Sequence, residues 1–352
     1  MSDGVLTEAY QRFHRTGPEW GADQLTNHGP MAAEVLVRRG RAEVVPGWVD
    51  AYIRRLDDLP RPIGEITDTS WPQALGDGRR IGDWTAYFAR QLTEQPWRQL
   101  LITWWPRLLP GIAAGATHGV IRTGHVVRTL LTSNEDQPTR DELGHALAFW
   151  AARSRSMPPA ATPAGRLDPQ AALDAVPRIA RQQGNLAARF GQLTPESGWP
   201  DAVGRLRPAT APDQVADRLA DLVAAATLRY LSHGHGQPVL LVHTATAPNA
   251  VLHALPALPD DLWVPSLTAV WTASAAIFAA YAPAEAAPPE STASESTAPE
   301  SAAEAIDRAV AHGDEHVIKF TDTAAEVFAR TGQPAALAAA LRVGALIPSP
   351  RA

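Results

Sequence analysis

A run of twenty residues without a charged side chain, 262–281, constrains the fold of this chain more than any other feature. Twenty helical residues are long enough to cross the apolar part of a bilayer. However, the run contains Pro265 together with threonine and serine residues, and acidic rather than basic residues precede it, which is atypical of a membrane span. We therefore predict a helix that is buried on all sides within a large helical core. We expect no membrane partner.

Apolar residues at three- and four-residue spacing predict helices along most of the remaining sequence. The predicted helices span 6–15, 32–39, 46–58, 83–92, 97–108, 116–131, 139–154, 212–231 and 302–330. Segment 238–242 is a short strand candidate, and alternating strand patterns are otherwise nearly absent, so we predict an all-α fold. We expect residues 1–352 to form a single large multi-helix domain. Within it, 282–303 is expected to be a disordered loop, because Ala, Pro, Ser, Thr and Glu bury too little apolar surface to order it.

Charge and composition exclude several kinds of function. The formal net charge of −6 offers no basic surface for a phosphate backbone, so we expect no nucleic-acid partner. The chain has no cysteine, which excludes disulfides, thiolate metal sites and thiol nucleophiles. The first residues lack the pattern of a signal peptide, and we expect a cytoplasmic protein. The glycine-spaced segment 76–82 does not follow a predicted strand, so we expect a turn there rather than a dinucleotide-binding loop.

Lys319 is the only lysine among 31 basic residues. A buried lysine can lose its proton, or react with carbon dioxide to give a carbamate, whereas arginine keeps its charge. Lys319 follows His316 by three residues, so both side chains are expected on one face of a helix. The position of this lysine therefore indicates chemistry more strongly than its rarity does.

Four histidines lie in apolar, helix-like surroundings, and they are His28, His118, His243 and His316. A single histidine in an apolar helix is more often a core residue than a ligand. Helical bundles nevertheless build metal sites from side chains on several helices, and imidazole suits iron, copper, nickel or zinc. On the helix predicted at 116–131, Arg122 and His125 share the face of His118, while glycines 111, 115 and 119 share another face.

Several short motifs along most of the chain resemble the questin oxidase-like family. They lie at 27–30, 96–98, 104–111, 115–122, 242–244 and 314–319. The most specific are Thr-His-Gly-Val-Ile-Arg at 117–122 and Glu-His-x-x-Lys at 315–319. Members of this family with roles in secondary metabolism open an anthraquinone ring by inserting oxygen beside a carbonyl, in a Baeyer–Villiger-like reaction.

The resemblance implies a metal site between core helices, with non-haem iron, expected as Fe²⁺, held by four histidines and a carboxylated lysine. The matching ligands in this sequence are His28, His118, His243, His316 and Lys319. It also implies an oxidoreductase, an oxygenase that acts on a polycyclic aromatic phenol or quinone with dioxygen, with NADPH as a candidate external reductant. Arg122 and His125 are candidate catalytic residues, because a cation facing the substrate would stabilise an enolate or phenolate.

Two other functions are compatible with the same residues. In the first, Lys319 forms a Schiff base with a carbonyl substrate and His316 acts as the base. In the second, the chain is a non-catalytic helical protein that binds an aromatic ligand in a pocket lined by some of its eleven tryptophans.

Overall fold

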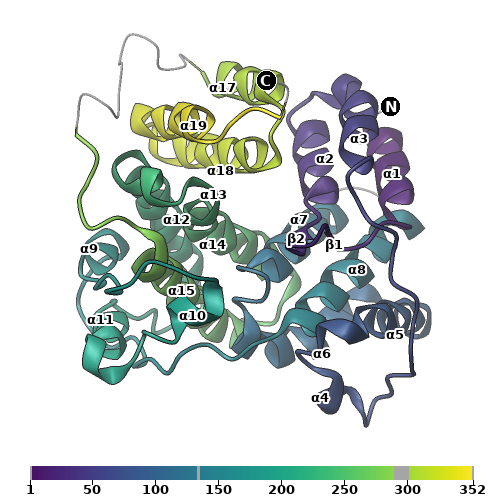
Figure 1. Cartoon of the computed structure of the whole chain (residues 1–352), viewed down its shortest axis with the longest axis horizontal. Coiled ribbons are helices and arrows are strands. Elements are labelled where there is room, and N and C mark those ends of the chain that lie inside the picture. Colours follow the sequence, from purple (N-terminus) through teal and green to yellow (C-terminus); the bar gives the residue numbers. More distant parts are fainter. Residues whose placement is uncertain (1, 133–134, 289–300, 351–352) are drawn as a thin grey trace. The chain divides into compact units, whose positions relative to one another are not determined.

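The computed structural model describes residues 2–132, 135–288 and 301–350, and these form an all-α protein (Figure 1). In the described part of the chain the β structure is limited to a two-residue antiparallel pair and two isolated bridges. The prediction of an all-α fold is therefore confirmed. The chain divides into two compact units, unit 1 (residues 1–156 and 253–262) and unit 2 (residues 157–252 and 263–352). The expectation of a single domain over 1–352 stays a prediction.

Unit 1 is built from the N-terminal helices and a short return of the chain. Its longer helices are α1 (Ser2–Phe13), α2 (Gly29–Arg38), α3 (Val45–Ile53), α5 (Ile81–Glu94), α6 (Trp97–Leu108), α7 (His118–Thr132) and α8 (Gln137–Arg153). Its short elements are β1 (Glu19–Trp20), β2 (Leu25–Thr26), α4 (Trp71–Ala74) and the 3₁₀ turns η1 (Ala42–Val44), η2 (Gly78–Arg80), η3 (Leu109–Gly111), η6 (Leu255–Ala257) and η7 (Asp260–Leu262).

Helix α8 lies at the centre of unit 1 and packs against α5, α7 and α1. Large aromatic side chains fill the space between these helices, and Trp84, Trp104 and Trp150 are each at most 1% exposed. Trp84 and Trp104 meet edge to face, with ring centroids 5.4 Å apart. Burial of rings of this size is a major contribution to core stability, so these tryptophans form the core of unit 1.

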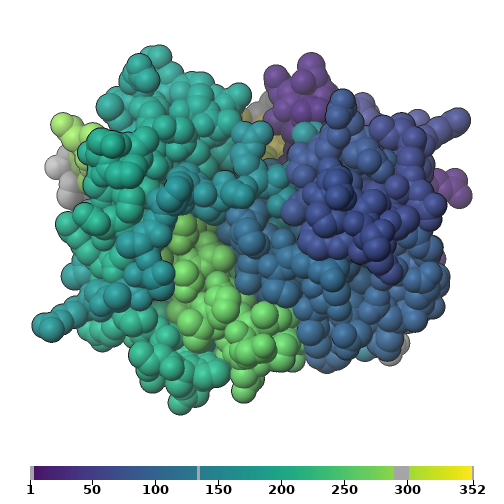
Figure 2. All heavy atoms as spheres, turned by 90° about the horizontal axis from the view of Figure 1, so that it is seen from below, coloured from purple at the N-terminus to yellow at the C-terminus, as the bar shows by residue number. Residues whose placement is uncertain are grey.

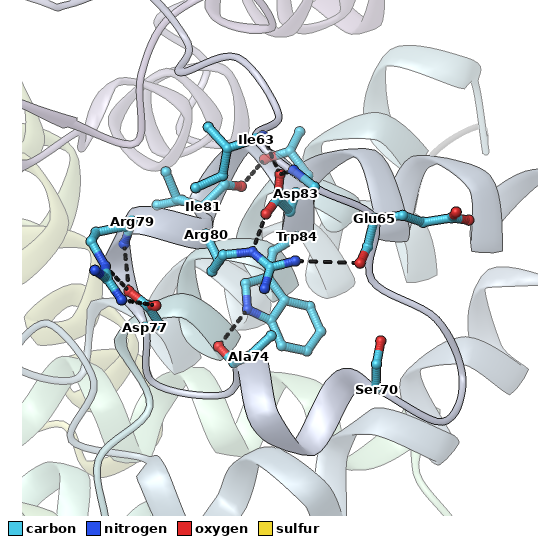
Figure 3. Close-up of polar contacts among 12 residues, drawn as sticks. Ile63, Glu65, Ser70, Ala74, Asp77, Arg79, Arg80, Ile81, Asp83 and Trp84 are labelled. Carbon is cyan, nitrogen blue, oxygen red and sulfur yellow. Dashed lines mark hydrogen bonds and ion pairs between the residues drawn. The ribbon is translucent and has the colours of Figure 1, made fainter.

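The glycine-spaced segment 76–82 forms the turn expected from the sequence (Figure 3). Asp77 accepts hydrogen bonds from the backbone of Arg79 at 3.1 Å and from its guanidinium at 2.9 and 2.7 Å. At the start of α5, Asp83 accepts a hydrogen bond from the backbone N–H of Ile63 at 2.6 Å. Carboxylates of the chain therefore satisfy these N–H groups and tie the preceding loop to α5.

Unit 2 consists of one group of long helices and several short ones. The long helices are α12 (Asp213–His233), α14 (His243–Ala254, in this unit up to residue 252), α15 (Trp263–Tyr281), α17 (Ala302–His312), α18 (Glu315–Thr331) and α19 (Pro334–Leu346). The short elements are α9 (Pro169–Asp174), α10 (Leu186–Phe190), α11 (Trp199–Gly204), α13 (Pro238–Leu241) and the 3₁₀ turns η4 (Pro195–Ser197) and η5 (Gly234–Gly236).

Helix α15 contains the uncharged run and is buried in unit 2, as predicted. It is the one helix in the described residues that is long and apolar enough to cross a membrane, and 67% of its most apolar window is buried. Figure 2 shows teal atoms from the segment before α12 lying against the light-green atoms of α15. At the C-terminal end of α15, Arg189 donates a hydrogen bond to the carbonyl of Ala280 at 2.8 Å. The burial supports the interpretation of this run as a core helix.

Two predicted boundaries and one predicted element type in unit 2 are wrong. The helix expected over 302–330 is broken, because Gly313 has a left-handed φ of 86° and Asp314 caps a new helix, α18. Residues 238–241 of the strand candidate 238–242 form helix α13 instead, and Pro238 occupies its first turn. The predicted loop 282–303 ends too late, since Ser301 caps α17, which begins at residue 302. Residues 289–300 of that loop lie outside the described residues.

Candidate metal centre

His28 is held at the N-terminal end of α2 by its backbone and by the neighbouring asparagine. It occupies the N-cap position, with Pro30 in the first turn of a helix that begins three residues before the predicted start at 32. The backbone N–H of His28 donates to the hydroxyl of Tyr52 at 2.7 Å. The amide of Asn27 accepts from the N–H of Gly29 at 2.9 Å and donates to the carbonyl of Gly17 at 2.9 Å. Hydrogen bonds of its own backbone and of Asn27 therefore fix the position of His28.

His118 is the first residue of α7, two residues later than the helix start predicted at 116. Gly115, Ala116 and Thr117 all have a positive φ, of 51°, 56° and 72°, so the chain turns sharply before the helix begins. The glycines at 111, 115 and 119 consequently do not share a helix face, contrary to expectation. At Gly115 a Cβ would lie 2.7 Å from the ring of Phe149, which requires glycine there.

The sharp turn also orients the imidazole of His118. Its Nδ1 makes a short hydrogen bond with the carbonyl oxygen of Gly115 and lies 3.3 Å from the hydroxyl of Thr26. A carbonyl oxygen only accepts, so Nδ1 carries the proton and Nε2 carries the lone pair. This is the arrangement in which backbone carbonyls hold metal-binding histidines.

Within unit 1 the two histidines form a pair. The ring centroids of His28 and His118 are 4.4 Å apart and the rings are nearly perpendicular, at 78°. Both residues are buried, with 4% and 6% exposed. Two imidazoles bound at right angles to one ion, through metal–nitrogen bonds of about 2.1 Å, place their centroids roughly 4.5 Å apart. The pair in unit 1 therefore fits neighbouring positions on one ion.

Within unit 2, His243 and His316 form a second pair. His243 is the first residue of α14 and His316 the second residue of α18. Their ring centroids are 6.1 Å apart at an angle of 66°, and both are buried. Imidazoles on opposite sides of one ion have centroids roughly 6.4 Å apart. The pair in unit 2 therefore also fits a shared ion, with a wider angle between the ligands.

Asp314 fixes the start of α18 and contacts His316. Its carboxylate accepts from the backbone N–H groups of His316 and Val317, at 2.8 and 3.1 Å, and lies 3.4 Å from Nδ1 of His316. Burial raises the pKa of Asp314, but its contacts with His316 outweigh burial and lower the pKa below its ordinary value. Ligand-type atoms of Asp314, Glu315 and His316 lie within 4.8 Å of one another. The capping role of Asp314 accounts for this cluster.

Lys319 lies one turn after His316 on α18, as predicted from their spacing, and is 2% exposed. Burial lowers the pKa of its ammonium from 10.5 to about 7, although Glu315 and Asp314 act in the opposite direction. Near neutral pH a large fraction of this amine is therefore uncharged. An uncharged amine is the form that reacts with carbon dioxide or with a carbonyl group.

The predicted catalytic residues Arg122 and His125 both contact carboxylates inside unit 1. Arg122 donates to Glu142 at 2.5 and 2.7 Å. His125 contacts Glu34 at 2.8 Å, and Arg128 donates to the same carboxylate at 3.0 Å through Nε and through a shorter second bond. These contacts link α7 to α8 and to α2. The catalytic roles of Arg122 and His125 stay predictions.

Sequence reasoning missed the polar residues that connect the helices of each pair. In unit 1 these are Glu34 and Arg128, each 3% exposed. In unit 2, Asn249 is 3% exposed and contacts α18. A usable signal existed for Glu34, because it is the only acidic residue in an otherwise apolar stretch, 29–37.

Comparisons with known proteins add no further assignment. No protein-family model matches the chain, and a search of curated proteins gave no match.

Proposed function

We propose that this chain is a non-haem, metal-dependent oxygenase that acts on a polycyclic aromatic phenol or quinone. In this proposal His28, His118, His243, His316 and a carboxylated Lys319 bind one ion, with iron as the metal. One observation carries the proposal. Each unit by itself brings two of the predicted imidazoles together at a separation that suits a shared ion. The motif resemblance supports the choice of iron and of the substrate class.

The ligand set suits a divalent transition metal. Neutral imidazoles are ligands for iron and its neighbours, and the proposed carbamate of Lys319 adds one negative charge, as a carboxylate would. The contact between His118 Nδ1 and the carbonyl of Gly115 keeps Nε2 as the donor nitrogen. Five ligands leave one position of an octahedral ion for dioxygen or a substrate oxygen.

The proposed reaction inserts one oxygen atom beside a ring carbonyl. One atom of dioxygen enters the carbon–carbon bond, and the other leaves as water after two electrons and two protons arrive from an external reductant such as NADPH. Bound iron would supply the activation of dioxygen. The residues of the chain hold the ligands in place, and the buried surroundings of Lys319 exclude water from the amine that becomes a carbamate.

The test is oxygen incorporation by the purified chain loaded anaerobically with Fe²⁺. A panel of hydroxyanthraquinones is supplied with ¹⁸O₂ and NADPH, and products are measured by mass spectrometry. We expect a lactone, or the hydroxy acid that forms when water hydrolyses it, with one ¹⁸O atom from dioxygen, and the loss of this product in Lys319→Ala and His243→Ala. His233→Ala is the matched control, because His233 is a buried histidine of unit 2 outside the ligand set. If the ligand variants lose metal binding but the parent chain gives no oxygenated product from the panel, the result would support the metal site and contradict the oxygenase activity.

A second candidate is a Schiff-base enzyme, which the lowered pKa of Lys319 favours equally. Borohydride reduction in the presence of a carbonyl substrate would attach the substrate covalently to Lys319. Trapping in metal-free protein would support this candidate, and a dependence of activity on iron would support the oxygenase.

A further inference from the structure

We propose that Glu34 and Asn249 are equivalent positioning residues, each of which sets the register of one pair of histidine-bearing helices. The inference rests on the proposed function, because it assigns both residues to the proposed metal site. Neither residue touches the proposed ion. Each acts through the helices on which the imidazoles are mounted.

In unit 1 the two helices α2 and α7 run in the same direction. His28 and His118 meet at their N-terminal ends, with ring centroids 4.4 Å apart. About two turns further along, Glu34 of α2 contacts His125 at 2.8 Å and Arg128 at 3.0 Å, both on α7. Glu34 lies six residues after His28, a helical rise of about 9 Å, and His125 lies seven after His118, a rise of about 10.5 Å. The contact between the two histidines and the contact between Glu34 and His125 therefore fix the same register.

In unit 2 the helices α14 and α18 repeat this arrangement. His243 and His316 meet at the N-terminal ends, with ring centroids 6.1 Å apart. Asn249, six residues after His243, donates to the hydroxyl of Thr323 at 3.4 Å and to the carboxylate of Glu326 at 2.8 Å. The contact is again about two turns beyond the histidines.

The positions correspond residue by residue. Glu34 and Asn249 each follow the first histidine of their pair by six residues, and their partners follow the second histidine by seven and ten. Helical periodicity alone explains why the two partners on the second helix, seven and ten residues after its histidine, lie on one face of that helix. It does not require that both pairs begin with histidine, run in the same direction and carry a buried polar contact at one height.

The contacts of Glu34 with α7 and of Asn249 with Thr323 are buried, and the contact of Asn249 with Glu326 is half-buried, which makes the register specific. Glu34 and Asn249 are each 3% exposed. A shift of one helix by a turn, about 5.4 Å, would separate the polar partners and leave them buried without these bonds. The same shift would separate the two imidazoles. The helix after each pair, α8 in unit 1 and α19 in unit 2, packs against the second histidine-bearing helix and completes the correspondence.

The test uses full-length Glu34→Gln, which removes the charge and one of the two accepting oxygens, and Asn249→Leu, which removes both donated hydrogen bonds. Both substitutions change the side-chain volume little. Glu142→Gln is the matched control, because it breaks a buried ion pair of α7 that leads to α8 and not to α2. Co²⁺ affinity is measured by titration calorimetry, with thermal unfolding recorded for each variant. We expect Glu34→Gln and Asn249→Leu each to weaken Co²⁺ binding about 10- to 100-fold. We expect Glu142→Gln to weaken it less than about 3-fold at a similar loss of Tm. Equal weakening by all three variants would overturn the proposal.

A second measurement works without metal. Ring ¹⁵N NMR signals of histidine in the metal-free chain report each imidazole directly. Glu34→Gln should change the signals of His28 and His118 and leave those of His243 and His316, and Asn249→Leu should do the reverse. This pattern together with an absence of Co²⁺ binding by the parent chain would reject the oxygenase proposal but keep the positioning roles. Changes in all four histidines, or in none, would overturn the inference. If one variant does not fold, the other decides the result.

Discussion

Arg122 and Glu142 form a buried two-point ion pair, with Nε to Oε1 at 2.5 Å and the second nitrogen to Oε2 at 2.7 Å. The side chains are 3% and 4% exposed. The pair joins the middle of α7 to α8, which is the central helix of unit 1. A guanidinium engaged by a carboxylate in this way contributes to the structure of unit 1 before it contributes to any chemistry.

The first prediction concerns this ion pair. Arg122→Met and Glu142→Gln should each lower the free energy of unfolding by about 3–5 kcal/mol, because each leaves one buried charge without its partner. Urea unfolding followed by circular dichroism measures the change. The double variant Arg122→Met/Glu142→Leu should recover most of the loss, because the unpaired charge is gone. Single-variant losses below about 1 kcal/mol would show that the pair is not structurally important.

The second prediction concerns acid stability and Glu34. Burial raises the pKa of this carboxyl, but Arg128 and His125 more than offset it and lower the pKa to about 2. Between its ordinary value of 4.5 and about 2, the unfolded chain binds a proton that the folded chain does not. The contacts of Glu34 with Arg128 and His125 therefore stabilise the fold fully above pH 4.5. This contribution, about 3 kcal/mol, is lost as the pH falls towards 2.

Unfolding measured from pH 2 to 6 should show this loss in the parent chain. Glu34→Gln should be less stable at pH 6 and less dependent on pH below 4.5. An unchanged acid limb in Glu34→Gln would contradict the assignment.

The third prediction concerns the pair His14 and His145 of unit 1, whose ring nitrogens are 3.0 Å apart. Burial, then the charges of Arg122 and His14, lower the pKa of His145 well below 6.5. Below pH 6.5 the unfolded chain therefore binds a proton that folded His145 does not, and stability falls as the pH falls. His145→Gln should flatten the stability profile just below pH 6.5, where carboxyl groups hardly titrate. The same slope in parent and variant would contradict the prediction.

The fourth prediction concerns Lys319 in the metal-free chain. Its folded pKa of about 7 lies below the unfolded value of 10.5, so the unfolded chain holds an extra proton between these pH values. Stability should therefore rise as the pH increases from 7 to 10.5, by an amount on the order of 5 kcal/mol. Lys319→Met should remove this slope and be more stable than the parent at pH 7. A less stable variant would show that the amine is better accommodated than its burial suggests.

The helical fold follows from features that the sequence displays openly. Apolar periodicity predicted most long helices, and the uncharged run predicted the buried helix α15. Boundaries failed where one residue changes the backbone, as at Gly313, whose positive φ ends one helix inside a segment predicted as a single helix. Ala116 and Thr117 also have positive φ, and neither residue type signals such a turn. Local pattern therefore predicts where helices lie better than where they begin.

The candidate site was predictable only in part. The sequence identified the histidines because they lie among apolar residues, and spacing placed Lys319 on the same helix as His316. Pairing could not be predicted from spacing, because His28 and His118 are ninety residues apart in the sequence. The contact of Asn249 with Glu326 could not be predicted either, because the residue type and position of an asparagine within a helix do not indicate which residue it contacts. Tertiary packing decides these contacts.

Anomalous diffraction at the iron edge, from crystals of the iron-loaded full-length chain, tests directly whether the four histidines and Lys319 bind one ion. We expect one iron peak per chain, about 2.0–2.2 Å from a ring nitrogen of each of His28, His118, His243 and His316, with density for a carbamate on Lys319. An iron peak bound by only one of the two histidine pairs, or crystals of loaded protein without an iron peak at these histidines, would contradict this expectation.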